Sequence, residues 1–527
     1  MTSNLETSNN ANGTICRDLP WLARWPRGVS SLLASLLLAM FVLCLLDKRT
    51  QNPLLILLWV TVGIAAVTDL RQSWKPRLLL VASTLFMTLI AGSAAAWISG
   101  SLLSAWSHFL QNQILVLWFA VLWICTPLVV LESVHSPFEF HILKLSVKLL
   151  VLYGMVALIS CFGSINPKLS MRSFSEELGP YIGLFAIICR LGLTCPEIAR
   201  GFGRHALTIG GLTVLAMSGV VSMRLLFADS TLVSWMEQRS LLLADPGASD
   251  SPWRLLFPFL HHNRAAYFAC CMVFLALAGL VVPGRAWRAF CGVVAILSFS
   301  VIFFTATRGA LLACACGLIV LVSMAILHRR SWWWCAFFVI LPGIWFLLPE
   351  AHRHRIAEAF RPAAYQADSG TTMDSRMFIW RKTATLVAHN PGLGTGYGFQ
   401  TYEFAFEKQF GKELEKYDAV PHAHNQWLEI TAETGFPAVV LFVMFTLARF
   451  WIISWALRSR PDGGFASFWF FACWLALEIA IQVYGLSNYP LRRGLGLLTY
   501  GIWAVGLVTA CSMASFWPAA KNSGKTA

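Results

Sequence analysis

Residues 309–327 read GALLACACGLIVLVSMAIL, a block without a single charged side chain. Arg308 precedes the block, and Arg329 and Arg330 follow it. The hydrocarbon core of a bilayer needs about 17–25 predominantly apolar residues in one helix. The stretch therefore predicts a transmembrane helix bounded by basic residues, and similar blocks recur along the chain.

The recurrence of these blocks predicts an all-α polytopic membrane protein. Two blocks, 54–68 and 181–194, are short enough to be re-entrant or half-length, so about twelve spans is the alternative to about fourteen. The predicted spans are 29–46, 54–68, 78–98, 114–131, 142–163, 181–194, 206–226, 265–283, 286–304, 309–327, 332–348, 436–457, 466–484 and 495–516.

The composition excludes a soluble enzyme. Of 527 residues, 57% are hydrophobic and only 13% are charged, whereas a soluble domain carries about a quarter charged residues. In a membrane protein, the net charge of +14 reports topology and contact with anionic lipid rather than nucleic acid. The 14 cysteines lie mostly inside apolar blocks and lack zinc-site spacing. We therefore expect no disulfide framework, no metal site and no cofactor.

Basic residues in the short connections predict the orientation. With the polar N-terminus inside the cell, most of them fall on the cytoplasmic side, and the outside connection 99–113 has none. Lys48–Arg49 and Arg492–Arg493 depart from this pattern. The inside residues are Arg17, Arg24, Arg27, Arg71, Lys75, Arg77, Arg200, Arg204, Arg285, Arg288, Arg329, Arg330, Arg458, Arg460, Lys521 and Lys525.

This orientation divides the chain into membrane and loop regions. We expect cytoplasmic tails at 1–28 and 517–527, and transmembrane helices over 29–349 and 436–516. Two larger loops, 227–264 within the first helical region and 350–435 between the two, then lie outside the cytoplasm.

The segment PHAHNQWLEITAETGFP, 421–437, is the richest in groups that do acid–base chemistry. His422 and His424 precede an apolar helix, for which Asn425 is a candidate N-cap. An imidazole titrates near working pH, so either histidine is a candidate general base. The alternative is that interfacial histidines simply bridge water and lipid. A metal site is less favoured, because no third ligand is evident.

Two further clusters lie at the ends of predicted spans. In TATRGALLA, 305–313, Arg308 stands between two apolar blocks, where it either extends outward to water or binds an anion. Its planar guanidinium suits bidentate binding of phosphate oxygens. In FLHHNRAAYFACC, 259–271, another histidine pair stands beside Asn263 and Arg264 ahead of a span on the same outer side.

The larger loop contains DSRMFIWRK, 374–382, with Arg376 and Arg381. The pattern over 375–388 predicts an amphipathic helix lying on the membrane. The run GLGTGYG, 392–398, is better explained by turns than by phosphate binding, because no strand and no Walker lysine flank it.

Together these clusters suggest chemistry that none suggests alone. Arginines that bind a polyanion, beside a histidine that takes a proton from a hydroxyl, suit group transfer from a phosphate or pyrophosphate leaving group. The apolar spans suit a lipid tail, and no DxD pair suggests a metal-dependent nucleotide-sugar mechanism. Glu478, inside a span, is expected to be structural, as partner of an arginine such as Arg190, with a proton relay as the alternative.

The order of these motifs over residues 255–440 resembles the bacterial O-antigen ligase and polymerase superfamily. Its His-x-His-Asn motif, followed by Glu and Gly, corresponds to 422–425 with Glu433 and Gly435. Its Ser/Thr-Arg-Gly motif corresponds to 307–309. Arg376, Trp380 and the Asn-Pro-x-x-Gly-x-Gly run 390–396 complete the likeness, and Asn263 also fits.

The resemblance implies a metal-independent C-type glycosyltransferase that works at the periplasmic face of the inner membrane. The donor would be a glycan on undecaprenyl pyrophosphate. His424 would be the base, Arg308 and Arg376 would bind the pyrophosphate with help from Arg264 or Arg381, and Asn425 and Asn263 would support them. Gly435-Phe436-Pro437 lacks a further glycine often found in the family, and the chain is longer than a typical ligase.

Three acceptors fit this implied chemistry. Lipid A-core would make the protein an O-antigen ligase, which is the favoured reading. A second lipid-linked repeat would make it an O-antigen or exopolysaccharide polymerase, and a protein Ser or Thr an O-oligosaccharyltransferase. A lipid or polysaccharide transporter predicts charges in mid-membrane and inverted repeats instead, and a scaffold leaves the outer arginines and histidines unexplained.

Overall fold

The computed structural model describes residues 139–194, 196–227, 231–239, 241–243, 253–259, 261–327, 350, 353, 372–417, 422–458 and 464–515. The predicted spans 29–46, 54–68, 78–98, 114–131 and 332–348 and the two predicted tails lie outside the described residues. Within the described part the chain is helical, apart from one pair of two-residue strands. The predicted all-α polytopic class is confirmed.

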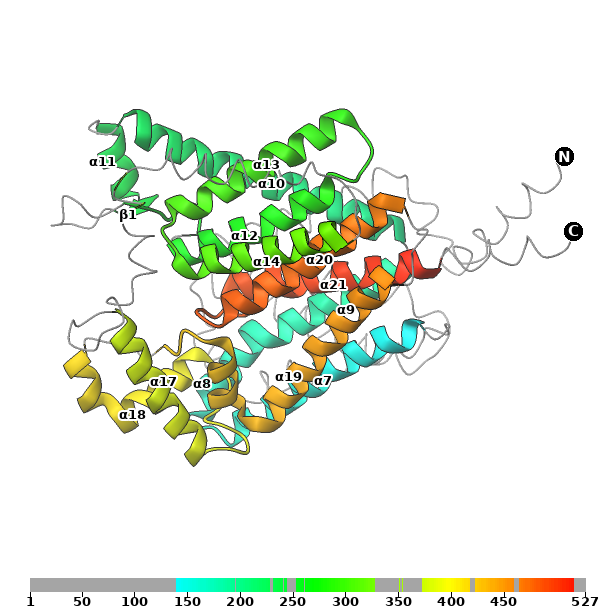
Figure 1. Ribbon diagram of the computed structural model, residues 1–527. Helices are drawn as coiled ribbons and strands as arrows, with labels where there is room; N and C mark the ends of the chain where they lie inside the picture. The colour runs from blue at the N-terminus through cyan, green and yellow to red at the C-terminus, as the bar shows by residue number, and fades with distance from the viewer. Residues whose placement is uncertain are drawn as a thin grey trace, which may run out of the picture. The chain divides into compact units, whose positions relative to one another are not determined.

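The elements keep the labels of Figure 1. Strands β1 (Leu242–Leu243) and β2 (Arg254–Leu255) pair antiparallel. The helices are α7 (Glu139–Phe162), α8 (Pro167–Ser173), the π-helical turn η2 (Phe174–Leu178), α9 (Gly179–Thr194), α10 (Pro196–Leu226), α11 (Thr231–Gln238), α12 (His262–Gly279), α13 (Arg285–Phe304), α14 (Arg308–Leu327), α17 (Thr372–His389), α18 (Phe399–Tyr417), α19 (Gln426–Arg458), α20 (Gly464–Gly485) and α21 (Arg493–Ser515).

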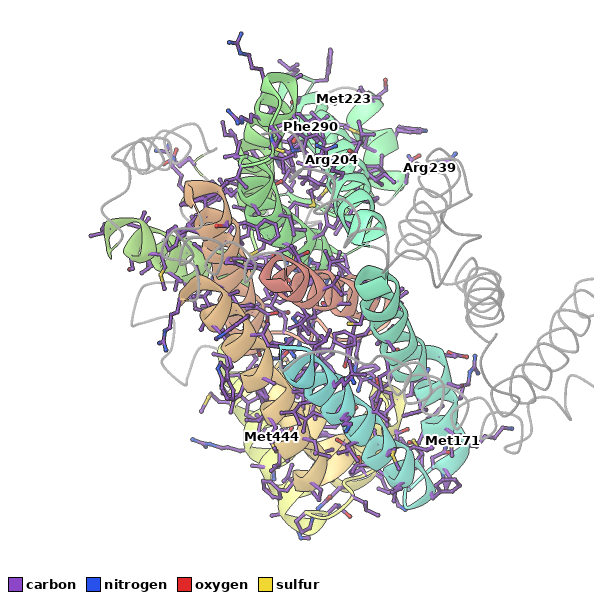
Figure 2. All side chains as sticks on the ribbon, turned by 90° about the vertical axis from the view of Figure 1, so that its right-hand side faces the viewer. Met171, Arg204, Met223, Arg239, Phe290 and Met444 are labelled. Carbon is purple, nitrogen blue, oxygen red and sulfur yellow. The ribbon has the colours of Figure 1, made fainter. Side chains whose placement is uncertain are left out.

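Six of the described helices are long and apolar enough to cross a membrane. They carry Leu143–Phe162, Ala206–Leu226, Arg285–Phe304, Arg308–Ile326, Gln426–Arg458 and Ala466–Gly485. Several expose large apolar side chains, as expected where a helix faces lipid. On α19, Leu447 and Trp451 are each 61% exposed, and Met444, labelled in Figure 2, is 46% exposed.

The chain divides into two compact units, and all the contacts that matter for the site lie within the second. The first unit comprises Met1–Leu158, Met171–Ala206 and Gly496–Ala527. In it, Tyr181 of α9 packs against Tyr500 of α21. The second unit comprises Ile159–Ser170 and Leu207–Leu495.

Helix α12 is the core of the second unit. Nearly all its side chains from Ala265 to Gly279 are buried, because α13, α14 and α20 pack around it (Figure 1). Close approach is possible because Gly317 of α14 lies against Phe274 and the Ala476 carbonyl. The predicted span 265–283 is therefore enclosed by protein, which explains why its pattern is apolar on every side.

A buried ion pair joins α19 to α20. The Arg449 Nε lies 3.4 Å from the Glu478 Oε1, and both side chains are at most 1% exposed. The Phe445 ring, 4.3 Å from the guanidinium carbon, covers the cation. Glu478 thus has a structural arginine partner, as the sequence suggested, and that partner is Arg449. A charge placed between helices needs such a partner, because an unpaired one costs several kcal/mol in a low-dielectric interior.

Helices α17 and α18 form a small lobe with its own core. The amphipathic helix predicted over 375–388 is α17, but its apolar face packs against α18 and the start of α19 instead of being free for the membrane surface. The shared core consists of Ile379, Leu386, Val387, Tyr402, Ala405, Phe406, Phe410, Ala423 and Ala432. Buried Thr383 and Tyr402 add a hydroxyl–hydroxyl bond of 2.7 Å between the two helices.

Helix α19 is broken at Gly435, where φ is 78° and ψ is 177°. Pro437 adds to the break because it has no N–H to donate. The glycine run binds the polar groups that the break releases. The Thr395 N–H donates to the Ala432 carbonyl at 2.8 Å, and the Gly396 N–H donates to the Glu433 carbonyl at 2.9 Å.

The loop segment around Thr395 is also hydrogen-bonded on its other side, by Ser164 and Ile165. The Thr395 carbonyl accepts from the Ile165 N–H at 3.2 Å and from the Ser164 hydroxyl at 2.9 Å. Gly394, Gly396 and Gly398 all have positive φ, a backbone that favours glycine. The glycine run is therefore a set of turns, as predicted, and it fixes the short helix 426–434 at an angle to the apolar stretch after the break.

Gly435→Ala should destabilise the fold. Its Cβ would collide with the Gly392 carbonyl, and its positive φ would be strained, at a cost of about 1–3 kcal/mol or more in the free energy of unfolding. Gly411→Ala in α18, where an added Cβ meets open space, should instead stabilise by about 0.5–1 kcal/mol. Denaturant unfolding of both variants in detergent tests this difference, and equal midpoints would contradict the structural role of the break at Gly435.

Candidate active site

The ends of several helices of the second unit meet on the side of the bundle where α17 and α18 lie (Figure 1). Helices α12 and α14 begin there, α20 ends there, and residues 422–425 enter α19 there. Hydrogen bonds described below join Asn263 at the start of α12 to the turn before Arg308 and to the end of α20.

Residues 422–425 form a tight turn ahead of α19. The Asn425 side chain accepts from the N–H groups of Trp427 and Leu428 at 3.0 and 3.2 Å, which confirms the predicted N-cap. The Trp380 indole of α17 donates to the Ala423 carbonyl at 2.7 Å. Both contacts fix the backbone that carries the two histidines.

His424 has a positive φ of 48°, which is costly for a residue with a Cβ. Its N–H donates to the His422 Nδ1 at 2.9 Å, and the two ring centroids are 4.4 Å apart. Among the described residues, Ala306 is the other non-glycine with positive φ, and it lies two residues before Arg308. Backbone strain of this kind concentrates at functional sites.

The His424 imidazole is held neutral. Burial, and next the positive charge of His422, lower the pKa of His424 from 6.5 to about 3. Arg376 and His261 act in the same direction. A neutral imidazole has a free lone pair to accept a proton throughout the physiological pH range, although so low a pKa makes it a weak base in the free protein.

Arg308 begins α14 directly after the turn that contains Ala306. The preceding Thr307 hydroxyl donates to the Asn263 side-chain oxygen at 3.3 Å. Arg308 itself is exposed. The N-terminus of a helix attracts anions because its first N–H groups are free and its dipole is positive there.

Asn263 joins three elements. Besides accepting from Thr307, its amide donates to the Asn488 side chain at 3.2 Å, and its carbonyl accepts from the Tyr484 hydroxyl at 2.7 Å. His261 caps α12 by accepting from the Asn263 N–H at 3.2 Å. Asn263 thereby ties the Arg308 turn to α12 and to the end of α20.

Arg376, on α17, faces the same region. Its pKa is lowered first by burial and then by the positive charge of Arg308. The charges of Arg376 and Arg264 both act on the Tyr484 hydroxyl. Arg376 is therefore within electrostatic reach of both Arg308 and His424.

Arg381 does not join this group. Five residues along a helix correspond to a rotation of about 140°, so Arg381 lies on a different face of α17 from Arg376 and is exposed. The Arg381 carbonyl accepts from the Thr385 hydroxyl, one helical turn later in α17, at 3.1 Å.

A buried charge cluster lies behind the histidines. Arg492, 7% exposed, forms an ion pair with Glu433 and places its Nε 3.4 Å from the Glu429 Oε1. The Glu429 Oε2 lies 3.6 Å from the His422 Nδ1. The Tyr489 ring, 4.7 Å from the guanidinium carbon, stacks against Arg492. The cluster links the α20–α21 connection to the start of α19.

Sequence reasoning treated Arg492 only as an exception to the predicted distribution of basic residues. Its burial beside two carboxylates explains that exception, because a paired internal arginine does not act as a free charge in a loop. Glu429 and Tyr484 were missed, and their only signal was an isolated polar group near the end of an apolar block. Among the described residues, no three His, Cys, Asp or Glu side chains gather as metal ligands do.

A comparison with known protein families finds a match to part of the chain. Residues 293–443 match the family model described as O-antigen ligase. The match supports the O-antigen ligase and polymerase superfamily that the order of the motifs indicated. No curated protein matches the chain. The O-antigen ligase region contains Arg308, Arg376 and both histidines of 422–424, whereas Asn263, Arg264 and Arg492 lie outside it.

The neutral state of His424 has a direct chemical test. Carbethoxylation by diethyl pyrocarbonate needs a neutral imidazole, so the rate at His424 should be almost constant between pH 7.5 and 5.5. Free N-acetylhistidine should slow about tenfold over this range, because its pKa is near 6.5. Peptide mass spectrometry resolves the site, with His424→Ala as the blank. A tenfold decline at His424 would mean that its pKa is not lowered.

Proposed function

We propose that the protein transfers a glycan from undecaprenyl pyrophosphate to an acceptor hydroxyl at the periplasmic face of the inner membrane. Lipid A-core is the favoured acceptor, which makes the protein an O-antigen ligase. The observation that carries the proposal is that Arg376 of α17 lies within electrostatic reach of both Arg308 of α14 and the neutral His424. The match to the O-antigen ligase family supports the same class of reaction.

In this proposal the arginines bind the diphosphate of the donor. Arg308 and Arg376 repel each other, as the lowered pKa of Arg376 reflects. An anion between two like charges relieves that repulsion, and the starts of α12 and α14 add positive dipoles on the same side. Arg264 assists from α12. These groups stabilise the negative charge that grows on the leaving oxygen.

His424 acts as the general base, with His422 as its neighbour and the alternative base. The acceptor oxygen forms a bond to the anomeric carbon as the bond from that carbon to the phosphate oxygen breaks. His424 takes the hydroxyl proton, and the lipid diphosphate leaves with the electron pair. Direct displacement inverts the anomeric centre, and no step of this reaction requires a metal.

The low basicity of His424 in the free protein fits this mechanism. A pKa of about 3 gives a weak base, and part of the lowering comes from Arg376. A bound diphosphate offsets that positive charge, so the basicity of His424 rises when the donor is in place. Proton abstraction is then coupled to donor binding.

Alanine variants assayed with a lipid-linked donor test the assignment. Arg308→Ala and Arg376→Ala should each lower transfer about 10²–10³-fold, and His424→Ala about 10²–10⁴-fold. Arg381→Ala is the matched control, because this exposed arginine of the same loop helix lies outside the proposed site and should leave transfer nearly unchanged. Near-normal transfer by the Arg308 and His424 variants would refute the mechanism, as would an equal loss in the control.

A deletion strain identifies the acceptor. Loss of a ligase should leave long polymer on the undecaprenyl carrier and none on lipid A-core. Single repeats on the core would instead indicate a polymerase, and loss of glycan from proteins an O-oligosaccharyltransferase. Purified protein that moves lipid across vesicles without transferring sugar would favour a transporter and overturn the enzymatic proposal.

A further inference from the structure

The connection between α20 and α21 lies outside the region that matches the O-antigen ligase family, yet it reaches the site at two places. Asn488 binds Asn263, which in turn holds the turn before Arg308. Arg492 reaches the two carboxylates at the start of α19. One short connection thus supports both the arginine side and the histidine side of the site.

The cluster around Arg492 contains two acids. Glu429 and Glu433 are both 0% exposed, and among the described side chains Arg492 is the guanidinium that contacts both. The cluster therefore has two buried acidic side chains around the guanidinium of Arg492. An ionised carboxylate in such a position is costly unless a positive group faces it.

His422 is a group that faces Glu429. Its Nδ1 lies 3.6 Å from the Glu429 Oε2, and its ring is 28% exposed. The same Nδ1 accepts the N–H of His424 at 2.9 Å, and the two rings lie against each other. Arg492, Glu429, His422 and His424 are therefore consecutive members of one chain of contacts.

We propose that Glu429 is a positioning residue for the histidine pair. Held by Arg492, Glu429 fixes the ring of His422 and stabilises the positive charge that the pair acquires when the acceptor proton is taken up. The inference rests on the proposed function. A carboxylate behind an imidazole serves the same purpose in other enzymes, where it orients the ring and stabilises the imidazolium.

Other charged groups also face the pair. His261 and Arg376 lower the basicity of His424, and Arg492 reduces the effect of Glu429 by pairing with it. All three disfavour a proton on the histidines, so the carboxylate of Glu429 is the contribution that opposes them. Glu433 lies one turn further along α19 and contacts Arg492 and the Gly398 N–H instead of a histidine.

This difference provides a matched pair of variants. Glu429→Gln and Glu433→Gln are isosteric, and each removes one acidic group while the other still contacts Arg492. A purely structural role predicts that the two variants behave alike. A positioning role predicts that Glu429→Gln alone affects the histidines.

The first readout is steady-state transfer with the full-length protein in nanodiscs. Glu429→Gln should lower kcat roughly 10–100-fold, the range for loss of a group that orients a reacting side chain, with the donor KM nearly unchanged. Glu433→Gln should retain kcat close to that of the unchanged protein. Glu429→Asp, which keeps the carboxylate, should recover part of the lost kcat.

The second readout does not depend on catalysis. Hydrogen–deuterium exchange of the peptide that contains 422–428 reports the His424 N–H bond to His422. Glu429→Gln should accelerate exchange there roughly two- to tenfold, as expected for the loss of one hydrogen bond, and Glu433→Gln should not. A peptide from the buried part of α12 serves as the folding control.

The outcomes separate the two proposals. If the unchanged protein transfers no glycan but exchange differs between the two variants, the proposed function fails and the positioning role of Glu429 survives in structural form. If transfer proceeds and the two variants match in both kcat and exchange, the positioning role is refuted and the function stands. Faster exchange in α12 as well would mean general unfolding and would also refute the inference.

Discussion

The break in α19 at Gly435 is the constraint on which the site depends. A straight helix from Gln426 to Arg458 would continue the direction of the apolar stretch beyond the break. The positive φ of Gly435 and the missing N–H of Pro437 interrupt it. The N–H groups of the loop segment around Thr395 then donate to the carbonyls that the break leaves without a helical partner. As a result, the short helix 426–434, with two glutamates, lies at an angle to the apolar stretch that follows it.

The hydrogen bonds along the break also join the lobe of α17 and α18 to the start of α19. The helices α17 and α18 pack on the start of α19 through their shared core, and Trp380 binds the Ala423 carbonyl. Arg376 is carried on α17, so its place near Arg308 depends on that packing. The strained backbones of Ala306 and His424 are stable because hydrogen bonds to Asn263 of α12 and from Trp380 of α17 hold the two turns. Such strain persists only where the surroundings determine the conformation.

The sequence was sufficient to predict the helical membrane fold, whereas the arginine and histidine site stays a prediction. Arg308 and His424 were identifiable because a polar group at the end of an apolar block is costly unless it has a partner or a role. Arg381 was grouped with Arg376 from proximity in sequence, but helical rotation separates their faces. Similarly, the apolar face of α17 suggested the membrane surface because a pattern shows that a face is buried but not what covers it.

Arg492 was beyond sequence reasoning for a different reason. Its partners Glu429 and Glu433 are some sixty residues earlier in the chain, and pairing at that distance is created by the fold. The cluster therefore connects two local observations that look unrelated: a basic residue in an unexpected connection, and two acids at the start of an apolar helix. Within the second unit, one set of contacts explains both. Two buried acidic side chains contact Arg492, and the His422 ring lies next to one of them, beside the neutral His424. In the proposed reaction, the buried acidic side chain beside His422 stabilises the positive charge that the histidines acquire.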